Sequence, residues 1–118
     1  MDLIFIHELR LETIIGVHPH ERLARQTLML DLELGADLRP AAATDRLNDT
    51  LDYQAVARRI GELASISHVQ LVETLAERIA ELLLGEFAVP WLRLTLRKPG
   101  ALPEAREAGV CIERGRRV

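Results

Sequence analysis

A single lysine and a single tyrosine stand out among the residues that could do chemistry. Lys98 is the only lysine among 15 cationic residues, the others all being arginine, and Tyr53 is the only tyrosine. An amine can exchange its proton where a guanidinium cannot, and a phenol can pass a proton on if a nearby ammonium lowers its pKa. Both are therefore candidates for proton transfer, while a solvated lysine and a packing tyrosine are the ordinary alternatives.

Glu73 is the candidate for binding a ligand. It lies in the first turn of a predicted helix, where the helix dipole alone would stabilise a carboxylate. A fixed carboxylate beside free backbone amides is also a natural receptor for a flat heterocycle with adjacent N–H donors, such as a 2-amino-4-oxo ring. Both roles fit the sequence.

His18, His20 and Glu21 form a short cluster with the residue types of a zinc site. Zinc sites usually draw on a second group of ligands farther along the chain, which this sequence lacks, and Pro19 separates the two histidines. We therefore expect polar loop residues here and no metal.

Four strands are predicted to carry these residues. Apolar and polar residues alternate along 9–15, 28–34, 92–96 and 109–114, and the first of these stretches follows the dense apolar run 3–6. Lys98 then comes directly after the third strand, in the constrained turn Lys98-Pro99-Gly100. A side chain at a rigid strand end is well placed for a site.

Two helices are predicted between the second and third strands. Apolar residues recur at steps of three and four over 56–64 and over 72–83. We expect a loop over 40–49, a cap for the first helix from Asn48, Asp49 or Thr50, and an end of the second at Gly85.

The resulting order ββααββ predicts a single domain over residues 1–118, of the α+β class, with helices on an antiparallel sheet. Such a sheet has two open edges. Long aliphatic edge strands invite pairing with another chain, and a ring of subunits would satisfy them. We therefore expect a closed homo-oligomer.

Composition argues against several classes of protein. A net charge of -3 opposes a nucleic-acid binder, and an aromatic content of 3% leaves few rings to stack on bases. The lone Cys111 predicts a buried, inert thiol in a reducing compartment, and the acidic N-terminus is unlike a signal peptide. We expect a cytoplasmic protein without a membrane span.

Taken together, six fragments resemble the dihydroneopterin aldolase family and span nearly the whole chain. They are Thr13-Ile14-Ile15-Gly16-Val17, Glu21, Asn48-Asp49-Thr50-Leu51-Asp52-Tyr53, Leu71-Val72-Glu73, Lys98-Pro99-Gly100-Ala101 and Gly109-Val110-Cys111-Ile112-Glu113-Arg114-Gly115.

This resemblance implies the tunnelling fold, in which four subunits close their sheets into one barrel and two rings usually stack as an octamer. It implies active sites at subunit interfaces. Glu21, Val72, Glu73 and Lys98 would come from one subunit, and Thr50, Leu51 and Tyr53 from its neighbour. Glu73 would anchor the pterin, while Lys98 and Tyr53 would manage protons.

The reaction implied is retro-aldol cleavage of 7,8-dihydroneopterin in folate biosynthesis, without a cofactor, because the N5=C6 imine of the substrate can accept the electron pair itself. Three alternatives stay open. One is the 2'-epimerase of dihydroneopterin triphosphate, for which Arg22, Arg25 or Arg106 could bind the triphosphate. The others are a zinc-dependent tunnelling-fold enzyme using His18 and His20, and a non-catalytic pterin binder.

Overall fold

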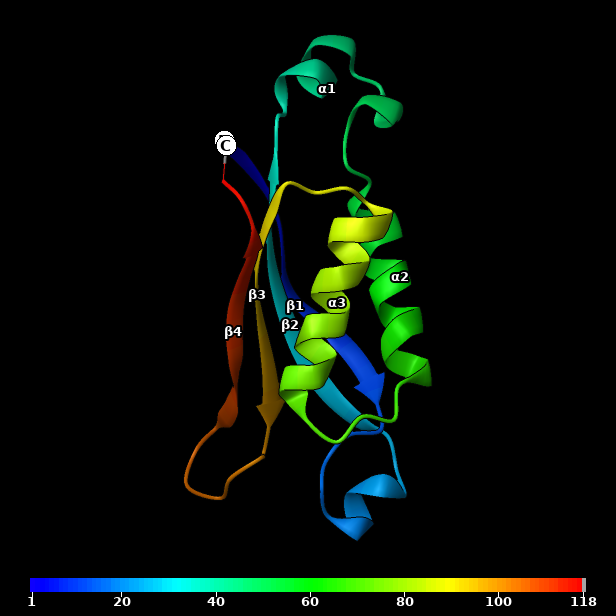
Figure 1. Ribbon diagram of the computed structural model, residues 1–118, viewed down its shortest axis with the longest axis vertical. Coiled ribbons are helices and arrows are strands. Elements are labelled where there is room, and N and C mark those ends of the chain that lie inside the picture. Colours follow the sequence, from blue (N-terminus) through cyan, green and yellow to red (C-terminus); the bar gives the residue numbers. More distant parts are fainter. Residues whose placement is uncertain (118) are drawn as a thin grey trace.

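The computed structural model describes residues 1–117 and contains the predicted order of strands and helices, with one short helix added (Figure 1). Its four strands form a single antiparallel sheet in the order β1-β2-β3-β4. They are β1 (Asp2–Thr13), β2 (Gln26–Ala36), β3 (Trp91–Pro99) and β4 (Glu107–Gly115). Because neighbours in the sheet are also neighbours in sequence, β1 and β4 are its two edges.

Two helices, α2 (Tyr53–Ile66) and α3 (Val72–Glu86), cover one face of this sheet (Figure 1). The period-two pattern of the strands explains which side chains they cover, since alternate residues point to one face. The core between the sheet and the helices is aliphatic. Its largest fully buried members include Leu28, Leu30, Leu32 and Leu34 from β2, Leu92 and Leu94 from β3, and Ile60, Leu75, Ile79 and Leu83 from the helices.

The opposite face of the sheet carries polar side chains that pair across the strands. Arg93 of β3 lies 2.7 Å from Glu33 of β2, and Arg97 lies 3.2 Å from Asp31. Cys111 of β4 also lies on this face and is exposed, so the prediction of a buried thiol is wrong. The strand alternation explains the error, because it turns Val110 and Ile112 toward the core and leaves Cys111 on the side without helices.

A bulge in β1 explains the two different patterns in its sequence. The register with β2 shifts between Ile6 and Leu9. Glu8, inside the bulge, has a φ of 57°, and its backbone N–H donates a 2.7 Å hydrogen bond to Asp31 Oδ1. The bulge adds one residue to β1 relative to β2, so the apolar stretch 3–6 and the alternating stretch from residue 9 onward both pair with β2 as parts of one strand.

The helix ends differ from those predicted. The cap of α2 is Asp52, whose carboxylate accepts from the backbone N–H groups of Gln54 and Ala55. The expected loop contains a short helix, α1 (Arg39–Thr44), and a 3-10 turn, η2 (Leu47–Asp49). Gly85 lies inside α3, which ends one residue later than expected, at Glu86, with Phe87 as its C-cap. Glycine favours helix ends, but Gly85 remains helical because the last turn of α3 continues past it.

The sheet runs along a molecule 51 Å long, and its two ends differ in what they carry. The β1–β2 connection, the α2–α3 connection and the β3–β4 loop meet at one end, which we call the loop end (Figure 1). The N-terminus, the end of β4, α1 and the start of α2 lie at the other, which we call the terminal end (Figure 1). In the described part of the chain, no helix has the length and apolarity that crossing a membrane requires.

Candidate active site

Lys98 and Glu21 form an ion pair at the loop end. The alternation along β3 places Lys98 on the same face as Leu94 and Leu96, just beyond the part of the strand that the helices cover. Its Nζ lies 2.5 Å from Glu21 Oε2, and the two side chains are only 16% and 13% exposed. The lone lysine is therefore withdrawn from bulk water and held by a carboxylate, contrary to the alternative of a solvated surface residue.

The local backbone holds Glu21 in place. It is the third residue of a 3-10 turn, η1 (Pro19–Arg22), and its Oε1 accepts a 3.2 Å hydrogen bond from the N–H of His18. Gly16 has a φ of 123°, and a Cβ there would lie 2.2 Å from the carboxyl carbon of Glu21. Only glycine fits, because its α-carbon forms the surface on which the carboxylate packs.

The pKa of Glu21 is lowered from 4.5 to about 2, chiefly by its hydrogen bond with Lys98 and then by that from the His18 N–H. Partial burial acts in the opposite direction and is outweighed. The carboxylate is consequently ionised at neutral pH and keeps the adjacent amine close by.

A cavity of about 330 Å³ lies beside this ion pair, which is near the lower limit for small-molecule pockets. Its lining includes His18, His20, Glu21, Gln26, Lys98 and Gly100. The two imidazole rings stack nearly parallel, with centroids 5.7 Å apart. Within residues 1–117 no three His, Cys, Asp or Glu side chains come together as metal ligands would. The arrangement thus offers a small cavity with one charged pair and two aromatic rings.

Glu73 and Val72 lie at the same end of the molecule, in the first turn of α3. No side chain caps this helix, whose N-cap is Leu71, so its first backbone N–H groups are available to a ligand. Glu73 is exposed and lies outside the lining of the cavity, so a ligand would have to reach out of the cavity to meet it. A hydrogen bond of 3.0 Å from Gly16 N to Gln70 O ties this helix start to the β1–β2 connection.

Thr50, Leu51 and Tyr53 lie at the terminal end, far from Lys98 in the same chain. Tyr53 is the first residue of α2 and is 59% exposed. The 14 residues of α2 rise about 1.5 Å each, so the helix alone carries the chain about 20 Å from Tyr53 toward the loop end. The structure therefore brings Glu21 and Lys98 together and places Val72 and Glu73 at the same end of the molecule, whereas Thr50, Leu51 and Tyr53 lie at the opposite end.

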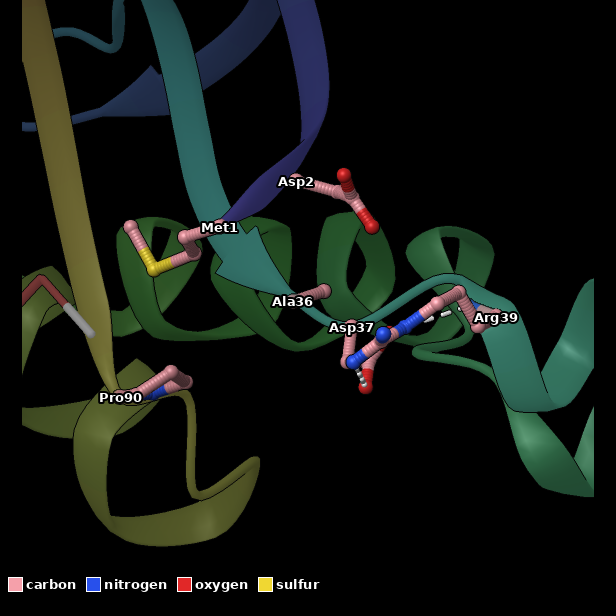
Figure 2. Close-up of a pocket in the computed structure, with 6 residues that line it drawn as sticks. All are labelled: Met1, Asp2, Ala36, Asp37, Arg39 and Pro90. Atoms are coloured by element: carbon pink, nitrogen blue, oxygen red, sulfur yellow. Dashed lines mark hydrogen bonds and ion pairs between the residues drawn. The ribbon is translucent and has the colours of Figure 1, made fainter.

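A larger hollow of about 620 Å³ lies at the terminal end and contains none of the predicted site residues (Figure 2). Met1, Asp2 and Pro90 contribute to its lining, and Arg39 lies 2.9 Å from Asp37 at its side (Figure 2). Its size alone does not make it the site, since it lacks a buried charged group of the kind seen at Lys98.

Two residues that matter for this geometry were missed in the sequence. Gly16 received no role of its own in the sequence analysis, although a glycine directly after a strand is a signal for positive φ. Arg22 was considered only as a ligand for phosphate, yet its guanidinium donates to main-chain carbonyl groups of Gly16, His68 and Val69. No local pattern announces such a long-range contact.

Comparison with known proteins identifies relatives of the whole chain. A family model described as dihydroneopterin aldolase matches residues 4–113. The dihydroneopterin aldolase of Escherichia coli K12 is 43% identical, with 98% of this chain and 94% of that protein aligned. The Haemophilus influenzae enzyme is 36% identical over 98% of both chains. The crystal structure of the E. coli enzyme in complex with neopterin superposes with a TM-score of 0.95, covering 98% of this chain and all of that one.

The ion pair predicts a specific pH dependence of stability. Because the pKa of Glu21 is lower in the folded state than its ordinary 4.5, the pair stabilises the fold above pH 4.5 and loses this effect as pH falls toward about 2. Glu21→Gln removes the titrating group. The difference in free energy of unfolding between wild type and variant should therefore shrink over that range, by at most about 3 kcal/mol.

Urea denaturation at a series of pH values measures this difference. The matched control is Glu104→Gln, a change at an exposed residue of the β3–β4 loop, which should leave the pH profile of the wild type unchanged. A wild-type minus Glu21→Gln difference that stays constant through the acid range would contradict the ion pair.

Proposed function

The chain belongs to the dihydroneopterin aldolase family, and from that premise we propose that it cleaves 7,8-dihydroneopterin into 6-hydroxymethyl-7,8-dihydropterin and glycolaldehyde, a step of folate biosynthesis. The observation that carries the proposal is the withdrawn amine of Lys98, paired with Glu21 beside a cavity of small-molecule size. The E. coli relative, crystallised with neopterin, supports a pterin as the ligand. We expect the protein to work in the cytoplasm.

The cleavage needs an electron acceptor, and the substrate contains one. A water molecule takes the proton of the 2'-hydroxyl, and C2' becomes the aldehyde carbon of glycolaldehyde as the C1'–C2' bond breaks. The electron pair of that bond forms a C1'=C6 double bond, and the electrons of the N5=C6 imine move to N5. No Schiff base to the protein is required, because the pterin ring does what such an imine would do.

Lys98 would stabilise this step as a general acid toward N5, directly or through one water molecule. Proton donation to N5 neutralises the charge that develops there, and an acid held in position contributes typically about 10²–10⁴-fold to a rate. The ionised Glu21 would keep the ammonium aimed into the cavity. The same pair could then accept the proton back when N5=C6 forms again.

Product formation requires a second proton transfer, to C1'. We assign it to Tyr53, whose exposed position at the start of α2 suits a role at a contact between subunits. Since Tyr53 and Lys98 of one chain lie at opposite ends, the phenol would have to come from a neighbouring subunit. Thr50 and Leu51, which precede it, would line the same part of the pocket.

The pterin itself would be held at the start of α3. The carboxylate of Glu73 would accept from the 2-amino group and a ring N–H, and the free backbone N–H groups of the first turn, at Val72, would donate to the ring edge. This places the heterocycle between α3 and the Lys98–Glu21 pair. Both roles proposed for Glu73 from the sequence, helix stabilisation and binding, are compatible with this position.

Sheet edges support a closed oligomer. β1 and β4 each pair on one side only, although they extend over 12 and 9 residues. Leu3 and Phe5 of β1 are exposed hydrophobic residues. Pairing of β1 with β4 of a neighbour would use these free backbone groups, and four such contacts would close a barrel with the polar face inside. We propose this ring, as a tetramer or as two stacked rings.

Two arginines of the loop end count against a triphosphate as the main substrate. Arg22 donates to three main-chain carbonyl groups, and Arg25 donates a 2.8 Å hydrogen bond to Ser65 O. A guanidinium engaged in this way is less able to bind phosphate without breaking those contacts. The 2'-epimerase of dihydroneopterin triphosphate is therefore the second candidate, with Arg106 of the β3–β4 loop as the remaining cation.

Incubation of the purified oligomer with 7,8-dihydroneopterin should release equimolar glycolaldehyde and 6-hydroxymethyl-7,8-dihydropterin, both measurable by liquid chromatography. The triphosphate should be a much poorer substrate at the same concentration. A sample that binds pterins without releasing either product would favour the non-catalytic alternative. Conversion of the triphosphate to its 2' epimer in preference to cleavage would favour the epimerase.

Lys98→Arg tests the proton-transfer role separately from the charge. Arginine keeps the positive charge and can still pair with Glu21, but it does not release its proton at accessible pH. We expect kcat to fall about 10²-fold or more while neopterin still binds. Retention of near-normal glycolaldehyde release by this variant would show that Lys98 acts only through its charge.

A further inference from the structure

Arg22 joins two segments of the loop end that are far apart in the sequence. Its Nη1 donates to Gly16 O at 3.3 Å and to Val69 O at 2.9 Å, and its Nη2 donates to His68 O. The first acceptor follows β1, whereas the other two belong to the α2–α3 connection, more than 45 residues later. One side chain thus bridges both connections.

The three acceptors explain why an arginine stands here. They lie outside regular secondary structure, so the sheet and the helices give them no backbone partners, and carbonyl groups near the interior need donors. A guanidinium has five N–H groups in a rigid planar fork and reaches separated acceptors from different nitrogens, whereas the three N–H groups of an ammonium all lie on one nitrogen at the end of a flexible chain. The bond from Gly16 N to Gln70 O, 3.0 Å long, closes the same contact from the other side.

These hydrogen bonds connect the segment that contains Glu21 with the segment that leads to Glu73, both at the loop end. Arg22 directly follows Glu21, which holds Lys98, and Val69 lies three residues before Val72, the first residue of α3. Leu75 and Ala76 fix the body of α3 in the core, but its first turn has no side-chain cap, so the position of Glu73 also depends on the connection that leads into the helix. The distance between Glu73, which would bind the pterin, and Lys98, which would donate the proton, therefore depends on how firmly Arg22 joins the two connections.

We propose that Arg22 is a positioning residue for substrate binding: it sets the start of α3, and with it Glu73, at a fixed distance from the Lys98–Glu21 pair. The inference rests on the proposed function, because it assigns Arg22 a role in holding the pterin ring for that reaction. Arg22 itself touches neither the substrate nor the proton path. Glu21 has its own contacts, to His18 N and Lys98, so the acid stays in place when Arg22 is replaced.

The test compares Arg22→Gln and Arg22→Lys with a matched control, Arg25→Gln. Arg25 belongs to the same connection and also donates to a carbonyl, but its acceptor is Ser65, still inside α2 and farther from Glu73. Each variant is assayed as the full oligomer for its Kd for neopterin, its KM and kcat with 7,8-dihydroneopterin, and its Tm. Neopterin serves as a probe of the anchor that is independent of turnover.

We expect Arg22→Gln to raise both the Kd for neopterin and KM about tenfold or more, and to leave kcat within about threefold of wild type. The reason is that a misplaced Glu73 would weaken the binding of the substrate and of the transition state equally. Arg22→Lys, whose single nitrogen can reach fewer of the three separated carbonyl groups, should lie between. Arg25→Gln should leave Kd and KM unchanged even if its Tm falls equally.

Equal changes in Kd for Arg22→Gln and Arg25→Gln, or a fall in Tm for Arg22→Gln without a change in Kd, would overturn the inference in favour of general stabilisation. Failure of both Arg22 variants to fold would overturn it too, since the buried core does not include this residue. If wild type binds neopterin but does not cleave dihydroneopterin, the proposed function fails, while the Kd comparison still decides the role of Arg22.

Discussion

The position of the two halves of the proposed site at opposite ends of one sheet is the constraint on which the rest of the account depends. Lys98 and Glu21 lie where β3 ends, while Tyr53 starts the helix that runs back along the sheet from the far end. No side-chain rotation closes a gap of this size. A site that needs both the amine and the phenol must therefore be built from two copies of the chain, and the two free sheet edges offer the means of joining them.

At the loop end, backbone geometry and electrostatics act together. The absence of a side chain at Gly16 lets the carboxylate of Glu21 pack on the backbone, and the carboxylate in turn holds the amine of Lys98 beside the cavity. Removing two charges from most of their water costs free energy, which close pairing and the hydrogen bond from His18 N offset. A withdrawn but paired amine is a suitable proton donor, because it is held in place and kept from bulk solvent.

Periodicity made most of the fold predictable from sequence. Alternation in β2 and β3 and the helical repeats of α2 and α3 gave the order and the layers correctly, and the uniqueness of Lys98 marked the residue that the structure withdraws from solvent. Exact helix ends and Cys111 were mispredicted because tertiary packing and strand facing decide them. The pairing of Lys98 with Glu21 and the contacts of Arg22 with His68 and Val69 join residues at least 46 positions apart, so no local pattern could reveal them.

Mixing two inactive variants tests the shared site most directly. Lys98→Ala and Tyr53→Ala each spoil every site of their own oligomer, but co-expressed in equal amounts they would assemble at random. If each site takes its lysine from one subunit and its tyrosine from a neighbour, about a quarter of the sites would contain both intact residues, and cleavage of 7,8-dihydroneopterin should return to about a quarter of the wild-type rate. Mixed oligomers no more active than the parent variants would contradict the account, because they would place both residues in one chain's site.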